Sequence, residues 1–109
     1  MKYKSEIVND LLILRLSGDL IGENGGVAIY EIASNAIQQQ IKRCVIDISD
    51  VRYIKSSGIG ILITILTKFR NKGGEVFLLK PSESVKKLLV ITKLNAIFQV
   101  IQSEDEVIN

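Results

Sequence analysis

Two adjacent serines, Ser56 and Ser57, follow Lys55 and precede the glycines Gly58 and Gly60 in the stretch KSSGIG. This composition is typical of a helix start, where a serine side chain accepts a hydrogen bond from a first-turn N–H group. The same N–H groups carry the positive end of the helix dipole and stabilise a bound anion such as phosphate. The glycines leave room for a second backbone to approach closely. The residues by themselves fit a plain helix cap, which is the simpler interpretation, or a serine hydroxyl that accepts a phosphate.

Two further stretches carry residue types that are suited to chemistry. Asp47 and Asp50 in DISDV are spaced as a pair that could bind a metal ion or transfer a proton. We expect Asp47 on a strand and Asp50 in the following turn, with no histidine or third carboxylate nearby, so a structural role is favoured. The glycine-rich residues 18–26, GDLIGENGG, lack the Gly-Lys-Ser/Thr ending of a phosphate-binding loop. They predict a flexible connection or, as the alternative, a loop that contacts a partner.

The composition excludes several classes of enzyme. The chain of 109 residues has no histidine, and Cys44 is its one cysteine. These counts exclude serine–histidine and cysteine–histidine pairs, CxxC redox pairs and the common zinc ligand sets. Cys44 begins an apolar run and is expected to be a small buried side chain. We therefore predict no catalytic residue, no metal site and no cofactor.

Charge and hydropathy bear on partners and location. The net charge is only +2 and the basic residues are scattered, which argues against direct nucleic-acid binding. The first residues lack the apolar region of a signal peptide, and the apolar stretch at residues 59–66 is too short to span a bilayer. A lone cysteine cannot form a disulfide within the chain, so nothing indicates secretion. We expect one cytoplasmic domain, residues 1–109, that does not bind a membrane.

The hydrophobic periodicity predicts an α/β fold. Alternating or continuous apolar runs predict strands at residues 3–8, 11–17, 44–49, 75–79 and 97–102, the first two joined by a turn at Asn9 and Asp10. Helical spacing predicts helices at residues 27–41 and 57–71, a third capped by Ser82, and a terminal turn capped by Ser103. Strand–helix–strand units predict a small, mixed, mostly parallel sheet of about 4–5 strands flanked by about 4 helices.

The helix predicted at residues 57–71 has more apolar residues than one face holds. The predicted core face consists of Ile59, Leu62, Ile63, Leu66 and Phe69. Ile61 and Ile65 lie off this face, next to a weakly polar stripe of Gly60, Thr64 and Thr67. Apolar residues beyond one face indicate either burial under neighbouring helices or a recognition patch, and both interpretations remain open.

The run CVIDISDVRYIKSSGIG, followed by a helix, the pair GG, a strand and the motif VKKL, resembles the STAS domains of bacterial anti-sigma factor antagonists. The resemblance covers residues 18–101. It implies a small mixed sheet flanked by helices, and a protein-interaction switch rather than an enzyme. In that family the unphosphorylated antagonist docks on an anti-sigma factor, often itself a serine kinase, and so frees a sigma factor. The kinase then phosphorylates the first serine of the motif, and a PP2C-type phosphatase resets the switch.

Carried over to this chain, the resemblance makes Ser56 the phosphate acceptor and Ser57 its neighbour and the helix N-cap. The expected partner-binding residues are Asp19, Ile21, Lys55, Ser56, Ser57, Gly58, Gly60, Ile61 and Thr64. Two positions depart from the family pattern, since Lys55 replaces the usual aspartate and Ile21 replaces an aspartate or asparagine. Lys55 motivates an alternative, a STAS scaffold or small-ligand module that phosphorylation does not regulate. The oligomeric state stays open.

Overall fold

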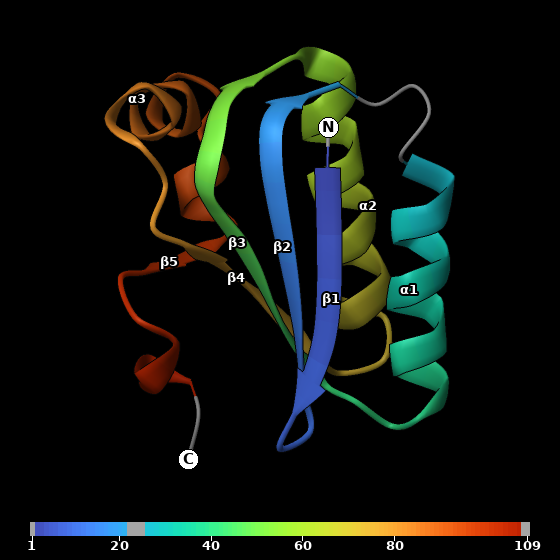
Figure 1. Ribbon diagram of the computed structural model, residues 1–109. Coiled ribbons are helices and arrows are strands. Elements are labelled where there is room, and N and C mark those ends of the chain that lie inside the picture. The colour runs from blue at the N-terminus through green and yellow to red at the C-terminus, as the bar shows by residue number, and fades with distance from the viewer. Residues whose placement is uncertain (1, 22–25, 108–109) are drawn as a thin grey trace.

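The computed structural model describes residues 2–21 and 26–107, and in them five strands form one sheet in the order β1-β2-β3-β4-β5 (Figure 1). The strands are β1 (Lys2–Val8), β2 (Leu11–Leu20), β3 (Arg43–Ile54), β4 (Glu75–Leu79) and β5 (Gln99–Ile101). The helices are α1 (Gly26–Gln38), α2 (Ser56–Arg70), α3 (Glu83–Ile91) and the short 3-10 helices η1 (Leu94–Ala96) and η2 (Glu104–Glu106). The predicted α/β class is confirmed, although the described part holds three α-helices instead of about four.

The first two strands form the predicted antiparallel hairpin, paired from Lys2 with Ser17 to Val8 with Leu11. Asn9 and Asp10 in the turn have φ angles of 50° and 66°. Two positive φ angles match the backbone twist of the flanking strands, and asparagine and aspartate tolerate them better than most residues. The residue types at the turn therefore specify the register of the hairpin.

Strand β2 continues to Leu20, so the start of the stretch predicted as a loop is strand. The extension exists because β3 runs alongside it, pairing Gly18 with Val51 and Leu20 with Ile54. Gly18 has a φ of 85° at a register shift, a conformation that favours glycine. The rest of the predicted loop, residues 22–25, lies outside the described residues, and Gly26 already belongs to α1.

The central strand β3 is also longer than predicted, because it continues past Ser49 to Ile54. Its first half is buried on both faces, as expected for a parallel strand between two others. Its second half buries only Val51 and Ile54 and exposes the residues between them. This one-sided pattern extends the strand beyond the continuous apolar run, so Asp50 lies in the strand instead of the predicted turn.

The main core lies between the sheet and the helices. Helices α1 and α2 pack side by side against one face of the sheet, and α3 contacts β3 farther along (Figure 1). Cys44 is fully buried here, which confirms the sequence prediction, and burial raises the pKa of its thiol. Ser82 caps α3 by accepting a hydrogen bond from the Val85 backbone N–H at 3.4 Å, as predicted.

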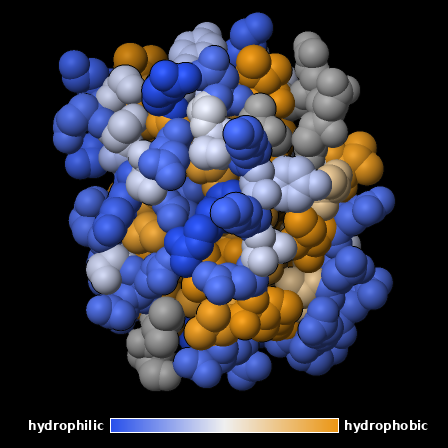
Figure 2. Space-filling view, viewed as in Figure 1, coloured by the Kyte–Doolittle hydropathy of each residue, from blue (hydrophilic) through white to orange (hydrophobic). Residues whose placement is uncertain are grey.

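The opposite face of the sheet carries a smaller apolar cluster of Leu11, Ile13, Val45, Phe77, Leu79, Ile101 and Val107. Ile101 lies on β5, and Val107 directly after η2 adds the C-terminal segment to this cluster. Ser103 caps η2 as predicted, and the Glu106 carboxylate accepts from the Ser103 N–H at 3.0 Å. Figure 2, viewed from this side, shows a mostly hydrophilic surface with apolar side chains gathered toward its lower edge. In residues 2–21 and 26–107, none of the helices has the length and apolarity that crossing a membrane requires.

Candidate functional site

The ends of β2 and β3 position the serine motif. Asp19 pairs with Tyr53 and Leu20 with Ile54, and the Lys55 backbone N–H donates to the Leu20 carbonyl at 3.1 Å. The chain then turns directly into α2 at Ser56. The motif and the residues at the end of β2, 35 positions earlier in the chain, therefore lie side by side at one edge of the molecule.

The start of α2 differs from the prediction in one residue. Helix α2 begins at Ser56, and Lys55 occupies the N-cap position with extended backbone angles of −80° and 165°. The prediction that Ser57 is the N-cap is therefore wrong. The hydrogen bond from the Lys55 N–H to the Leu20 carbonyl continues the pairing of β2 and β3 up to Lys55, and the helix begins at the next residue. The Lys55 side chain makes no capping hydrogen bond, and the first turn holds no acidic residue. Ser56, the proposed phosphate acceptor, is exposed at the first helical position.

The two glycines of the motif have opposite surroundings. A Cβ atom on Gly58 would clash with the Leu20 carbonyl oxygen and would lie 2.9 Å from the Leu20 carbonyl carbon. The close approach at Gly58 is therefore made by β2 of the same chain, which corrects the expectation that a partner uses this space. Gly60 is exposed, and a Cβ atom there would meet nothing within 4 Å. Of the two, only Gly60 offers backbone to a partner.

The packing of Gly58 also decides which face of α2 is buried. The buried residues are Gly58, Ile61, Leu62, Ile65, Leu66 and Phe69, which follow helical spacing from Gly58 onward. Ile61 is only 1% exposed, so the expectation that it contacts a partner is corrected in favour of burial. A Cβ atom on Gly26 at the start of α1 would lie 3.7 Å from the Ile61 side chain, which shows what covers it.

Ile63 differs from its prediction in the opposite sense, because it was expected in the core and lies on the surface. It is 39% exposed and lies on the same stripe of α2 as Ser56 and Gly60. Thr64 beside it is half-buried. The sequence pattern did not indicate that Ile63 is exposed, because the apolar residues of α2 fit two overlapping helical faces. The close packing of Gly58 on Leu20 determines which of the two faces is buried.

Tyr53 is a second residue that the sequence analysis did not select. It is 53% exposed on β3, opposite the exposed Asp19, while Ile21 just beyond is half-buried. Tyr53 is one of two exposed residues between the buried Val51 and Ile54, in the part of β3 that the sequence analysis did not assign to a strand. We name as the Ser56 surface the residues Asp19, Ile21, Tyr53, Lys55, Ser56, Ser57, Gly60, Ile63 and Thr64.

The Ser56 surface mixes exposed apolar side chains, two charges of opposite sign and accessible helix backbone. Such a mixture is typical of the surfaces by which proteins dock on each other. The positive end of the α2 dipole and the neighbouring Lys55 favour a negative group on Ser56. The arrangement can therefore dock a protein and accept a phosphate at one position.

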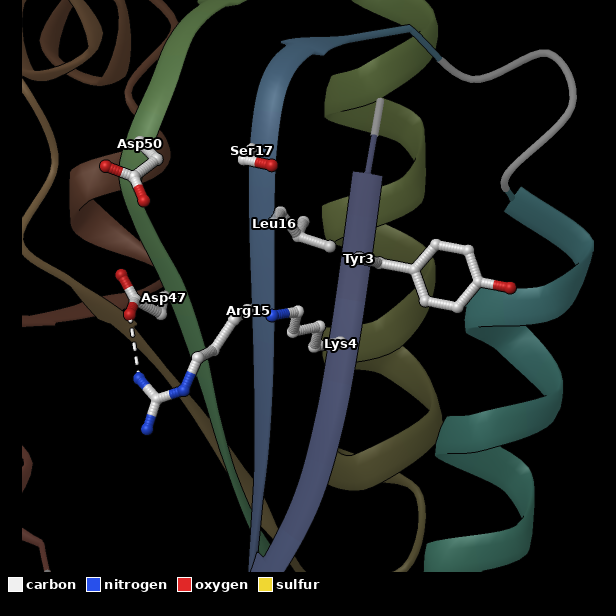
Figure 3. Close-up of a pocket in the computed structure, with 7 residues that line it drawn as sticks. All are labelled: Tyr3, Lys4, Arg15, Leu16, Ser17, Asp47 and Asp50. Carbon is white, nitrogen blue, oxygen red and sulfur yellow. Dashed lines mark hydrogen bonds and ion pairs between the residues drawn. The ribbon is translucent and has the colours of Figure 1, made fainter.

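The acidic pair Asp47 and Asp50 serves a different purpose. Asp47 accepts hydrogen bonds from the Ser49 N–H at 3.0 Å and hydroxyl at 2.7 Å, and from Arg15 at 2.9 Å (Figure 3). Partial burial alone would raise the pKa of Asp47, but the bonds from Ser49 and Arg15 together lower it. Asp50 lies farther along β3, opposite Ser17, and the two carboxylates do not share a partner. These contacts support the structural role that the sequence favoured for Asp47.

Comparison with known proteins adds to this geometry. A Thermotoga maritima protein, named for a proposed role as anti-sigma factor antagonist, is 26% identical over 104 residues, covering 95% of this chain and 92% of that protein. The anti-sigma F factor antagonist of Paenibacillus polymyxa is 23% identical over 104 residues, covering 95% and 89%. The solved structure of the Bacillus cell fate determinant SpoIIAA in its phosphorylated form has the same fold, with a TM-score of 0.75 and 21% identity over 97% and 96% of the two chains.

The family model described as STAS domain matches residues 2–107, almost the whole length of the chain. The mixed sheet, with its hairpin strand at one edge and the serine motif at the start of α2, agrees with that match. The chain therefore belongs to the STAS domain family.

Proposed function

We propose that this protein is an anti-sigma factor antagonist, which binds an anti-sigma factor through the Ser56 surface and so frees a sigma factor. The observation that carries the proposal is the exposure of Ser56 at the first position of α2, on the same stripe as the open Gly60. Membership of the STAS family and the names of the Thermotoga and Paenibacillus relatives support the same role.

Phosphorylation of Ser56 is the proposed off switch. A serine-kinase anti-sigma factor adds the phosphate, and a PP2C-type phosphatase removes it. The phosphate adds about −1.5 to −2 charges, which at a packed interface disrupts binding through repulsion and lost hydration. The domain itself tolerates the charge, because the group lies at the positive end of α2 beside Lys55. Binding is therefore lost while the fold is kept.

Mass spectrometry tests the phosphate site. The protein is incubated with the serine-kinase anti-sigma factor of its own organism and ATP, and phosphopeptides are mapped. We expect one phosphate on Ser56, which persists in Ser57→Ala and disappears in Ser56→Ala. Phosphate on Ser57, or on no serine, would contradict the assignment.

Calorimetry with the same anti-sigma factor tests the docking surface. We expect Ser56→Ala to bind as the wild type does and Ser56→Glu to bind at least about tenfold more weakly. Ser5→Glu adds the same charge on the exposed edge strand β1 and is the matched control. Equal affinities of Ser56→Glu and Ser5→Glu for the anti-sigma factor would rule out Ser56 as part of the interface.

Gly60→Ala separates binding from folding. The added Cβ meets nothing within the chain, so the free protein keeps its structure. A partner that packs on the bare backbone at Gly60 meets that atom, and we expect the affinity to fall several-fold. An unchanged affinity would show that the partner does not approach α2 at Gly60.

Lys55 favours a second candidate function, a STAS module that does not cycle through phosphorylation. Lys55 is exposed beside Ser56 and reverses the charge that the family usually carries there. In that case the protein binds a scaffold partner or a small ligand in one fixed state. Lys55→Asp distinguishes the two functions: gain of phosphorylation by the anti-sigma kinase in Lys55→Asp, with none in the wild type, supports the second.

A further inference from the structure

The last turn of α3 exposes two aliphatic side chains. Ile91 is 78% exposed, more than any other large apolar residue in the described part of the chain, and its neighbour Val90 is 61% exposed. Together with Lys86 and Lys87 they line a shallow hollow of about 350 Å³. We name these four residues the α3 patch. The two neighbouring aliphatic side chains offer an apolar contact to another molecule.

The fold cannot bury the α3 patch by a small rotation of the helix. Val85 and Leu89 already face the core, and Val90 and Ile91 follow at 100° steps around the helix. The N-terminal end of α3 is held by the Ser82 and Ser84 hydroxyls, which donate to β3 carbonyls at 3.4 and 3.3 Å. The exposure is therefore built into the packing of α3.

The charges around the hollow are basic. Lys86 contacts Glu83 at 3.3 Å in an exposed pair, whereas Lys87 makes no ion pair within the described residues. Lys93 follows two positions after Ile91 and is exposed as well. A ligand that complements this region therefore has carboxylates, which pair with the lysines, around an apolar side chain, which contacts the hollow.

Three other occupants fit less well. A second copy in a symmetric pair would bring the lysines of one patch against those of the other. A membrane surface is bound by an apolar stripe along a helix, whereas Val85 and Leu89 of α3 are in the core. Proteins that bind single-stranded nucleic acid place aromatic side chains at the centre of the contact, because bases stack on them, whereas Val90 and Ile91 are aliphatic.

We propose that the α3 patch is a second docking site, which binds an acidic segment of another protein. One bulky apolar side chain of that segment enters the hollow between Val90 and Ile91, and its carboxylates pair with Lys87 and Lys93. In Figure 1, α3 lies on the other side of β3 from α1, and the α3 patch shares no residue with the Ser56 surface. The proposal is therefore independent of the Ser56 surface and of the function proposed for it.

Amide chemical shifts of the labelled protein test the proposal with a defined probe. The probe is a short capped peptide with one leucine between aspartates and glutamates. Two control peptides replace the leucine with alanine, or the acids with their amides. We expect the probe to shift amides of α3 from Lys86 to Lys93 in the wild type and in Ser56→Glu alike, with weaker binding of both controls.

Variants with intact folds complete the test. Lys87→Glu and Ile91→Ser change exposed side chains and should each weaken probe binding at least about threefold. Lys72→Glu makes the same charge change after α2 and should leave it unaltered. Equal binding by Lys87→Glu and Lys72→Glu, or shifts scattered away from α3, would overturn the proposal. The proposal would also be overturned if the α3 patch bound phosphatidylglycerol vesicles more strongly than the probe, or if the patch were buried in a dimer of this protein.

Discussion

At the scale of single residues, the two glycines of the serine motif show how one composition serves two purposes. Gly58 lets α2 pack directly on the backbone of β2 at Leu20, and Gly60 faces open space. Nothing in the short motif itself distinguishes them. The contact of Gly58 is a property of the fold, while the exposure of Gly60 leaves it available to a partner.

Alanine substitutions at the two glycines should have opposite effects on stability. Gly58→Ala forces backbone apart at Leu20, and we expect a loss of about 2 kcal/mol or more in the free energy of unfolding. Gly60→Ala places a better helix former in open space, and we expect a gain of about 0.5–1 kcal/mol. Urea unfolding of both variants measures the difference. A loss at Gly60 equal to that at Gly58 would contradict the assigned packing.

At the scale of elements, the start of α2 has an unusual electrostatic composition. Lys55 lies at the N-cap, no acidic residue follows in the first turn, and Lys68 and Arg70 lie in the last turn. The basic residues at the C-terminal end complement the helix dipole, but Lys55 at the N-terminal end opposes it. A negative group at Ser56 would supply the missing complement.

A charge at Ser56 should therefore stabilise the free protein while it weakens docking. We expect Ser56→Glu to raise the free energy of unfolding by about 0.3–1 kcal/mol at low salt, and less at high salt. Thr67→Glu, on the same exposed stripe near the other end of α2, should lower it. Thermal unfolding at two salt concentrations checks both signs. A destabilised Ser56→Glu would mean that the helix start does not accommodate a phosphate.

At the scale of the whole molecule, Arg15 joins three distant parts of the chain. Its guanidinium contacts Glu6 on β1 at 2.9 Å, Asp47 on β3 at 2.9 Å and Glu104 in η2 at 2.8 Å. Figure 3 shows the Arg15 side chain reaching across the sheet toward Asp47. The network holds the C-terminal turn over the second apolar cluster, and it depends on ionised carboxylates.

Acid should weaken this network with a defined sign. Because the folded-state pKa of Asp47 is lowered, its contribution to stability is present above its unfolded pKa of about 3.9 and is lost as pH falls through the folded value. We expect Asp47→Asn to cost about 1 kcal/mol at pH 7 and progressively less toward pH 2. Unfolding free energies across this range measure it.

Asp50→Asn is the matched control for Asp47→Asn. Asp50 is exposed on the same strand, and its side chain makes no hydrogen bond or ion pair with the described residues. We expect Asp50→Asn to follow the wild-type pH profile. If Asp47→Asn follows it as well, the contact between Arg15 and Asp47 contributes no pH-dependent stability.

Much of the fold was predictable because its causes are local. The turn at Asn9 and Asp10, the caps at Ser82 and Ser103 and the burial of Cys44 each follow from a residue type within its immediate neighbours. The predicted ends of β2 and β3 were wrong, because both strands are longer than predicted. Each strand extends because the other pairs with it. Pairing across the sheet is not visible in either stretch alone.

The sequence by itself determined the α/β class, the strand and helix order and a serine motif at a helix start. It did so because hydrophobic periodicity and capping act over a few residues. The tertiary structure decided which face of α2 is buried, because the contact between Gly58 and Leu20 orients the helix on the sheet. That contact moved Ile61 into the core and Ile63 onto the surface, and it made Gly60 the open glycine. The hydrogen bond from the Lys55 N–H to the Leu20 carbonyl, also made only in the folded sheet, placed Lys55 instead of Ser57 at the N-cap beside Ser56.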